Sequence, residues 1–438
     1  MDKTQLVVVP SPGISHLAST VEFAKLLIHH DHRLTITNVA LTHFTGFSSF
    51  LEQIVEIYKP RVRQAVSDLI SDPDSPQIGG FIVDMFCTDM IDIADEFGLS
   101  PLVFLTSGTA LLGVALHLHT LRERDNIDTT ASEFKQPGKH VDIPCFANKV
   151  PVTVLPSIAV EESWKSYFWN YGRGFKRAKG IIVNTFEEFE SHAIRSLSKG
   201  DNIKVYPVGP ILGKKADSHE KSGIIEWLDD QPPSSVLYLC FGSKVSLGKD
   251  QAREVASALE RSGVRFLWSL RKQGPGMPPS DYSDYSEILP EEFLERTAGI
   301  GRLIGWAPQT QILAHKAIGG FVSHCGWNSV LESVYYGVPI ATWPLYAEQQ
   351  LNAFELVEEL KMGVEICLDY NMAYELGTKF LGSERIEKGI RDVMKEDNEI
   401  RKKVKEMSGI CQKTLMEGGS SYFHMSRFID DLIEMKFK

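Results

Sequence analysis

Polar side chains gather between Trp306 and Gln349, around a point where a strand pattern passes into a helix pattern. The apolar run Gly319–Ser323 is followed by the side chains of His324 and Asn328 and then by the helical segment SVLESVYYG. Such a turn leaves backbone N–H groups unpaired at the positive end of a helix dipole. An imidazole and an amide at the same turn add further polar groups. We therefore predict a binding site for a doubly charged diphosphate here.

A second candidate site lies near the N-terminus. His16 follows an apolar run in VVVPSPGISHL, and Asp84 ends the run FIVD, so both stand at carboxyl ends of predicted strands, where open α/β sheets bind ligands. A neutral histidine can take a proton from a hydroxyl, and a carboxylate can fix its tautomer. Spacing alone also allows His16 merely to start a helix. Asp89, Asp92 and Asp95 compete with Asp84, but solvent-facing or capping roles are favoured for them.

The bulk properties are those of a globular enzyme with two domains. The chain has 438 residues, 43% hydrophobic and 24% charged. Its net charge of −11 opposes binding to nucleic acid or an anionic membrane. The first apolar run is too short for a signal peptide, and no run is long enough for membrane insertion. The six cysteines lack CxxC spacing, which favours reduced thiols and a cytoplasmic location. Neither His324–Cys325 nor Asp72–Asp74 makes a convincing metal site, so no metal is expected.

Apolar runs alternate with helical patterns in both halves, which predicts doubly wound parallel sheets. Strands are expected at residues 6–10, 34–41, 81–84, 101–106, 181–184, 234–243, 264–270, 301–306, 319–324 and 340–344, and helices at 16–30, 251–262 and 421–438. The polar segment Pro207–Gly223 has the composition of a domain linker, and Ser269–Pro290 that of a mobile insertion.

The stretch from Trp306 to Gln349 resembles the signature box of the plant family-1 UDP-dependent glycosyltransferases, which glycosylate small secondary metabolites. The segments VVVPSPGISHLAS, FIVDMFCTDMIDIADEFG, GIIVNTFEEFE, VLYLCFGS and EGGSS extend the resemblance over almost the whole chain. The resemblance implies the GT-B fold, with two Rossmann-like domains facing each other across a cleft. We expect an acceptor-binding domain at 1–206, a linker at 207–223, a UDP-sugar-binding domain at 224–420 and a helix at 421–438 that crosses back to the first domain.

The resemblance also implies roles for individual residues. His16 and Asp84 match the catalytic dyad, Trp306 the indole that stacks on uracil, and Glu332 the carboxylate that binds the ribose hydroxyls. Gln349 at the last position of the box goes with glucose, whereas a histidine there is associated with galactose. The full set of positions expected to bind the UDP-sugar is Gly13, Thr106, Ser243, Trp306, Ala307, Gln309, His324, Trp327, Asn328, Ser329, Glu332, Glu348 and Gln349.

The expected activity is inverting, UDP-glucose-dependent O-glucosyl transfer to a flavonoid, another phenolic or a terpenoid, giving a β-glucoside. UDP-glucose is the donor substrate, no metal or other cofactor is needed, and a monomer is the default. The alternatives are a nucleotide-sugar epimerase on the same architecture, and a nucleotide-sugar-binding protein without catalysis, which would not need the dyad. One departure stands out: the stretch from Asn38 to Glu52 is shorter than the family usually carries, so residues are expected to be missing there.

Overall fold

The computed structural model describes residues 3–39, 51–131, 136, 138–200, 203–213, 223–272, 280–372 and 379–434. The chain divides into two compact units. The first unit comprises Met1–Val152, Ile158–Lys214 and Cys411–Lys438, and the second comprises Thr153–Ser157 and Lys215–Ile410. Most of the unusually short stretch after Asn38, and most of the expected linker, lie outside the described residues.

The first unit is built on a six-stranded parallel sheet with the strand order β2-β1-β3-β4-β7-β8. Its strands are β1 (Thr4–Val9), β2 (Leu34–Asn38), β3 (Gln77–Asp84), β4 (Pro101–Leu105), β7 (Gly180–Val183) and β8 (Val205–Pro207). The inner strands are almost wholly apolar and buried, as a parallel sheet covered on both faces requires. Five of the six strands were predicted within a few residues, and only the short β8 was missed.

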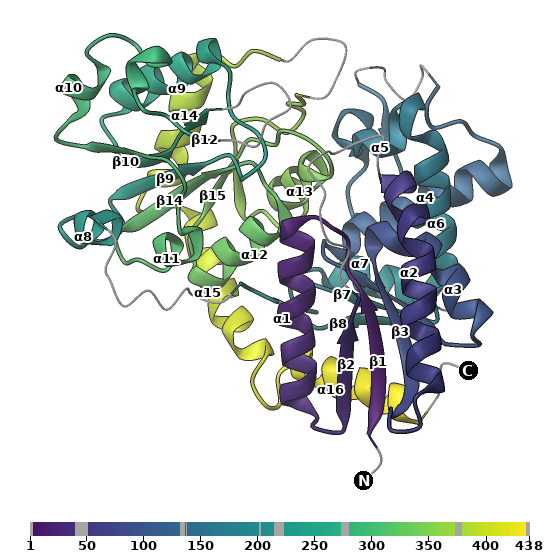
Figure 1. Cartoon of the computed structure of the whole chain (residues 1–438). Coiled ribbons are helices and arrows are strands. Elements are labelled where there is room, and N and C mark those ends of the chain that lie inside the picture. Colours follow the sequence, from purple (N-terminus) through teal and green to yellow (C-terminus); the bar gives the residue numbers. More distant parts are fainter. Residues whose placement is uncertain are drawn as a thin grey trace. The chain divides into compact units, whose positions relative to one another are not determined.

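Helices cover both faces of this sheet (Figure 1). They are α1 (Ile14–His30), α2 (Leu51–Ser71), the 3₁₀ helix η1 (Met85–Met90), α3 (Ile91–Glu96), α4 (Thr109–Asp125), α6 (Lys165–Arg177), α7 (Ser191–Gly200) and α16 (Ser420–Ile433). Shorter elements are β5 (His140–Val141), β6 (Val150–Pro151), η3 (Val152–Val154), α5 (Ser157–Val160) and η4 (Glu162–Trp164).

The last helix, α16, completes the core of the first unit. Phe428 and Leu432 are fully buried and share one hydrophobic cluster with Phe23 of α1 and Phe104 of β4. Figure 1 shows α16, in yellow, running beneath the strands of this sheet. A polar contact reinforces the packing, because Asp431 accepts hydrogen bonds from Tyr206 Oη at 2.6 Å and from Lys204 Nζ at 3.2 Å. Helix α16 is therefore structural for the first unit.

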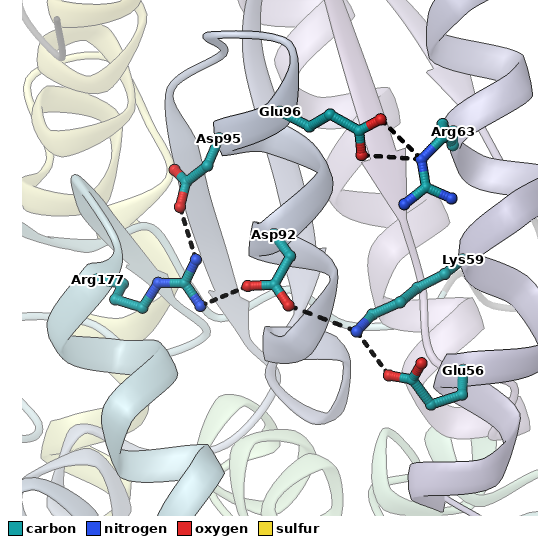
Figure 2. A network of polar contacts seen from close by, with 7 residues as sticks. All are labelled: Glu56, Lys59, Arg63, Asp92, Asp95, Glu96 and Arg177. Carbon is teal, nitrogen blue, oxygen red and sulfur yellow. Dashed lines mark hydrogen bonds and ion pairs between the residues drawn. The ribbon is translucent and has the colours of Figure 1, made fainter.

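Ion pairs tie α2 and α6 to α3 on the outside of the first unit (Figure 2). Asp92 pairs with Arg177 Nη1 at 2.7 Å and with Lys59 Nζ at 3.5 Å, and Asp95 pairs with Arg177 Nη2 at 2.6 Å. Figure 2 also shows Arg63 of α2 paired with a carboxylate of α3. The side chains of Asp92 and Asp95 are about half exposed, which confirms that they face solvent as predicted. In addition, both form ion pairs with Arg177.

The second unit repeats the plan with the strand order β13-β10-β9-β14-β15-β16, again all parallel. Its strands are β9 (Val236–Cys240), β10 (Arg265–Ser269), β13 (Gly301–Ile304), β14 (Ile318–Ser323), β15 (Ile340–Thr342) and β16 (Gly363–Glu365), with a small hairpin of β11 (Arg271–Lys272) and β12 (Ser280–Asp281). The helices are α8 (Gly223–Asp229), α9 (Lys249–Ser262), η5 (Tyr285–Glu287), α10 (Phe293–Thr297), α11 (Gln309–Leu313), α12 (Trp327–Tyr336), α13 (Gln349–Phe354), the π-helix η6 (Glu355–Glu359), α14 (Ser383–Met394) and α15 (Glu399–Thr414).

The boundary between the two units falls between Ile410 and Cys411, within α15. It therefore lies before the helix at 421–438, which the sequence analysis expected to cross back to the first domain. The segment Ser269–Pro290, which was expected to be a mobile insertion, contains the paired strands β11 and β12. Residues 273–279 between them are not among the described residues. Among the described residues, no helix combines the length and apolarity needed to span a bilayer.

Candidate active site

Both sheets have a topological switch point, and several of the predicted site residues lie at these two points. In the first sheet the chain passes from β1 outward to β2 and then back to β3 on the other side of β1. In the second sheet β10 and β14 flank β9 in the same way. Ligands of open α/β sheets bind at the carboxyl ends of the strands at such points. His16 follows β1 and Asp84 ends β3, whereas His324 follows β14.

In the first unit the structure brings His16 and Asp84 together. His16 lies in the first turn of α1, and its Nδ1 is 2.9 Å from Asp84 Oδ2. The His16 side chain is 16% exposed, whereas the carboxylate is fully buried. The other carboxylate oxygen, Oδ1, accepts the backbone N–H of Phe86 at 2.9 Å and so caps η1. Asp84 is thus held from both sides, and the Nε2 edge of His16 is the one that remains for a substrate proton.

Thr106 and Phe86 complete the surroundings of His16. Thr106 follows β4, and its buried hydroxyl oxygen lies 2.9 Å from His16 Nδ1. The ring of Phe86 lies 4.8 Å from the imidazole, centroid to centroid, and Phe86 is partly exposed. Gly13 caps α1 with its backbone only, and a Cβ there would lie 3.4 Å from the His16 ring. Phe168 of α6 is buried in the core of the first unit.

In the second unit, a sharp turn joins β14 to α12. Cys325 has a φ of +60°, a left-handed conformation that costs energy for any residue other than glycine. The turn places the imidazole of His324 beside two glycines. A Cβ on Gly242 or Gly326 would lie 2.8 Å or 2.6 Å from His324 Nε2. Helix α12 begins after Gly326 without a side-chain cap, so its first N–H groups can bind an anion.

The electrostatics of this turn suit a diphosphate. Burial lowers the pKa of His324 to about 4, so its imidazole is neutral and serves as a hydrogen-bond donor through one nitrogen. Trp327 starts α12 with its side chain buried, while Asn328 is partly exposed and Ser329 buried. Ser243 lies exposed in the loop after β9. The indole of Trp327 is therefore buried rather than presented to a ligand.

The positions predicted for the nucleotide form a connected set. Trp306 is 64% exposed, unusual for an indole, and so offers a free flat surface. The backbone N–H of Trp306 donates to Asp281 Oδ1 of the β11–β12 hairpin at 3.0 Å. Ala307 lies next to it in the turn before α11, where its carbonyl accepts from Gln309 N at 2.9 Å. The side chains of Gln309 and Glu332 are joined by a hydrogen bond.

Glu332 is held by two neighbours from α11. Gln309 Nε2 donates to Glu332 Oε2 at 2.8 Å and also to Ser329 Oγ at 2.8 Å. Thr310 Oγ1 donates to Glu332 Oε1 at 3.3 Å. Burial raises the pKa of Glu332, and the two hydrogen bonds work against this rise. Gln309 therefore positions the carboxylate that is predicted to bind the ribose.

Glu348 and Gln349 stand at the start of α13, after Ala347 with its φ of +59°. Gln349 Oε1 accepts the backbone N–H groups of Leu345 and Tyr346 at 3.0 Å and 3.1 Å. Because these bonds occupy its carbonyl, the amide nitrogen is the part of Gln349 that is left to donate to a sugar hydroxyl.

Sequence reasoning missed three residues at these sites. Thr310 bonds Glu332, and Asp281 holds the backbone of Trp306. Lys244, two residues after Gly242, is partly buried; burial lowers its pKa to about 8, and the charge of Glu348 opposes this shift. The sequence offered one signal for Lys244: it follows directly after the CFGS motif and could place a cation beside the turn predicted to bind the diphosphate. Among the described residues, no group of three or more histidine, cysteine, aspartate or glutamate side chains is arranged to hold a metal ion.

The comparisons with known proteins match this chain to one family. The family model described as "UDP-glucoronosyl and UDP-glucosyl transferase" matches residues 203–410. The "UDP-glucose flavonoid 3-O-glucosyltransferase 6" of Fragaria ananassa is 48% identical over 98% of each chain, and the "Anthocyanidin 3-O-glucosyltransferase 1" of Manihot esculenta is 45% identical over 96% of this chain and 100% of its own. The first alignment runs over 482 positions, more than the 438 residues present, so it must open gaps in this chain.

Solved structures agree. A UGT transferase from Siraitia grosvenorii in complex with UDP superposes with a TM-score of 0.90 at 43% identity, covering 98% of this chain and 100% of its own. A Medicago truncatula enzyme complexed with UDP-glucose gives a TM-score of 0.86 at 36% identity, covering 98% of both chains. The chain belongs to the family of UDP-glucuronosyl and UDP-glucosyl transferases. It is a UDP-glycosyltransferase, and the GT-B fold with two Rossmann-like domains is confirmed.

Proposed function

We propose that this enzyme transfers glucose from UDP-glucose to a hydroxyl of a small plant metabolite, a flavonoid, another phenolic or a terpenoid, with inversion to a β-glucoside. The observation that carries the proposal is the His16–Asp84 contact of 2.9 Å at the first switch point. The names of the relatives from Fragaria ananassa and Manihot esculenta support flavonoid-type acceptors, and the Medicago truncatula complex supports UDP-glucose as donor.

The reaction follows from the side chains. His16 Nε2 accepts the proton of the acceptor hydroxyl while the hydroxyl oxygen forms a bond to the anomeric carbon. The bond between that carbon and the β-phosphate oxygen breaks, and UDP leaves with the electron pair. A single displacement of this kind on an α-linked donor gives a β-product. The buried Asp84 stabilises the imidazolium that forms, as an aspartate does in hydrolase triads.

The second unit supplies the donor contacts in this proposal. Trp306 stacks on uracil, and Glu332 accepts from the ribose hydroxyls. The N-terminus of α12 with His324 binds the diphosphate, whose charge develops as it leaves. Glu348 and Gln349 bind hydroxyls of the sugar. The proposal includes no metal.

Two further elements belong to the same proposal. All six cysteines are buried free thiols, which supports the cytoplasm as the compartment. We also propose a monomer, the state in which each chain carries one base and one donor site.

The test is product formation by mass spectrometry with purified protein, UDP-glucose and a panel of flavonoids, simple phenols and triterpenes, without added metal. A gain of one hexose on an acceptor is the expected result, and the NMR coupling of the anomeric proton should report a β-linkage. His16→Ala should abolish transfer while UDP binding, measured by calorimetry, remains unchanged. Full transfer by the His16→Ala variant would falsify the role of His16.

Two outcomes favour the alternatives. UDP-glucose that is bound but transferred to no acceptor, even when UDP-galactose and UDP-xylose are tried, indicates a binding protein. Conversion of UDP-glucose to another UDP-hexose without an acceptor indicates an epimerase.

A further inference from the structure

One ring nitrogen of His16 lies within hydrogen-bonding distance of two oxygen atoms. Nδ1 is 2.9 Å from Asp84 Oδ2 and 2.9 Å from Thr106 Oγ1. An imidazole nitrogen carries either one proton or one lone pair, so its two neighbours decide which form is stable. An ionised carboxylate can only accept, and the Phe86 backbone N–H on Oδ1 fixes the orientation of the Asp84 carboxylate. A proton on Nδ1 therefore satisfies Asp84, whereas a lone pair there would oppose it.

The hydroxyl of Thr106 has a separate acceptor for its own proton. Oγ1 donates to the thioether sulfur of Met85 at 3.5 Å. A thioether can only accept, so this contact turns the hydroxyl proton toward Met85 and a lone pair of Oγ1 toward the imidazole. Thr106 is buried, with 7% of its surface exposed, and water competes little for the hydroxyl.

The position of Thr106 in the sheet explains why it reaches His16. β3 lies between β1 and β4; Asp84 is its last residue, and His16 and Thr106 lie in the chain segments that follow β1 and β4. Three parallel neighbours thus bring a base and two oxygen atoms to one sheet edge. Resemblance to the family placed Thr106 among the residues that contact the sugar, and the contacts here suggest a different task.

We propose that Thr106 is a positioning residue for the base: with Asp84 it shares the Nδ1 proton of His16 and so keeps Nε2 unprotonated and turned toward the acceptor. The inference rests on the proposed function, in which His16 is that base. The same two oxygens stay in place when Nε2 takes up the proton, so the imidazolium forms without reorganisation of its Nδ1 side.

Steady-state kinetics separate a positioning role from a sugar contact. Thr106→Val keeps the shape and removes the hydroxyl, whereas Thr106→Ser keeps the hydroxyl. We expect Thr106→Val to lower kcat about fivefold to tenfold, the effect of one neutral hydrogen bond. The KM values for UDP-glucose and UDP-xylose should stay within about twofold, and Thr106→Ser should restore kcat. A raised KM for UDP-glucose with unchanged kcat would overturn the proposal, because that pattern is the loss of a sugar contact.

A second measurement does not depend on catalysis. Two-bond ¹H–¹⁵N correlation spectra of protein with ¹⁵N-labelled histidine report which ring nitrogen carries the proton, and the His16 signals are those missing from His16→Ala. The wild type should show the Nδ1–H tautomer, and Thr106→Val should show a measurable share of the other form. Identical His16 signals in both proteins would refute the role of Thr106. Thr106→Ala serves for both measurements if the valine variant does not fold.

The two experiments keep this inference apart from the proposed function. A wild type that transfers sugar to no acceptor defeats the proposed function, while the ring signals still decide whether Thr106 fixes the tautomer. A wild type that transfers sugar, with a Thr106→Val variant equal to it in kcat and in ring signals, defeats only the inference on Thr106.

Discussion

Replacing Glu332 with glutamine probes the donor site where its geometry is best defined. Each carboxylate oxygen of Glu332 already accepts one hydrogen bond, Oε2 from Gln309 at 2.8 Å and Oε1 from Thr310 at 3.3 Å. Lone pairs remain on both oxygens for the 2′ and 3′ hydroxyls of a ribose. In Glu332→Gln one oxygen becomes an NH₂ group, which cannot accept from a hydroxyl and, on the Gln309 side, would face another NH₂ group.

The magnitude follows from these contacts. A hydrogen bond to a charged group contributes about 1.5–3 kcal/mol, and a neutral one about 1 kcal/mol. Glutamine removes one charge-assisted bond to ribose outright and weakens the other, a loss of roughly 3 kcal/mol in binding free energy. Since each 1.4 kcal/mol is a factor of ten, we expect the Kd for UDP to rise roughly 100-fold.

Isothermal titration calorimetry with two ligands distinguishes this mechanism from general damage. UDP and 2′,3′-dideoxy-UDP differ only in the two hydroxyls, so Glu332→Gln should weaken UDP roughly 100-fold but the dideoxy ligand much less. Glu406→Gln, on an exposed position of α15, is the matched control and should leave both affinities unchanged. An equal loss for both ligands would mean that Glu332 does not bind the ribose, and the reasoning would be wrong.

Two further predictions concern a cation and a carboxylate. Because the pKa of Lys244 is lowered to about 8, its positive charge is present at pH 7 and is lost as the pH rises through 8. UDP-glucose keeps its charge over this range and should therefore bind the wild type more weakly at pH 8.5 than at pH 7. Calorimetry on Lys244→Met should find an affinity for UDP-glucose that is weak and independent of pH. A pH dependence that survives in Lys244→Met would contradict this assignment. Asp431→Asn should destabilise the first unit by about 2 kcal/mol. Most of this loss comes from the hydrogen bond donated by Tyr206, because Lys204 is 37% exposed and its charge is screened by solvent. The variant should have a lower thermal melting temperature and still bind UDP; an unchanged melting temperature would argue against a structural role for this contact.

The fold was largely predictable because its strands are buried on both faces. Continuous apolar runs such as those of β1, β4 and β9 leave few alternatives to a parallel sheet. In the two six-stranded sheets, sequence reasoning missed β8 and β16, which have three residues each. The equally short β15 was predicted because it begins the longer run IATWP. Length of the apolar run, rather than position in the sheet, thus decided which strands could be predicted.

The pairing of His16 with Asp84 was predicted from their places at strand ends together with the family resemblance, and the structure places them in contact. The bonds among side chains could not be predicted in the same way. The contact from Thr106 to His16 joins residues 90 positions apart, and Gln309 reaches Glu332 across 23 positions. Such contacts depend on side-chain rotamers in the folded state, which no sequence pattern encodes.

The last helix has a consequence for the order in which the protein can fold as it is synthesised. The second unit is continuous from Lys215 to Ile410 apart from Thr153–Ser157, so nearly all of it leaves the ribosome before the final segment is made. The core of the first unit, although most of its chain is translated first, lacks Phe428, Ile429 and Leu432 until α16 has been translated. The unit that carries the base is therefore begun first and finished last. Until α16 has been made, the side of the core that α16 covers is exposed, and the nascent chain can aggregate or bind chaperones.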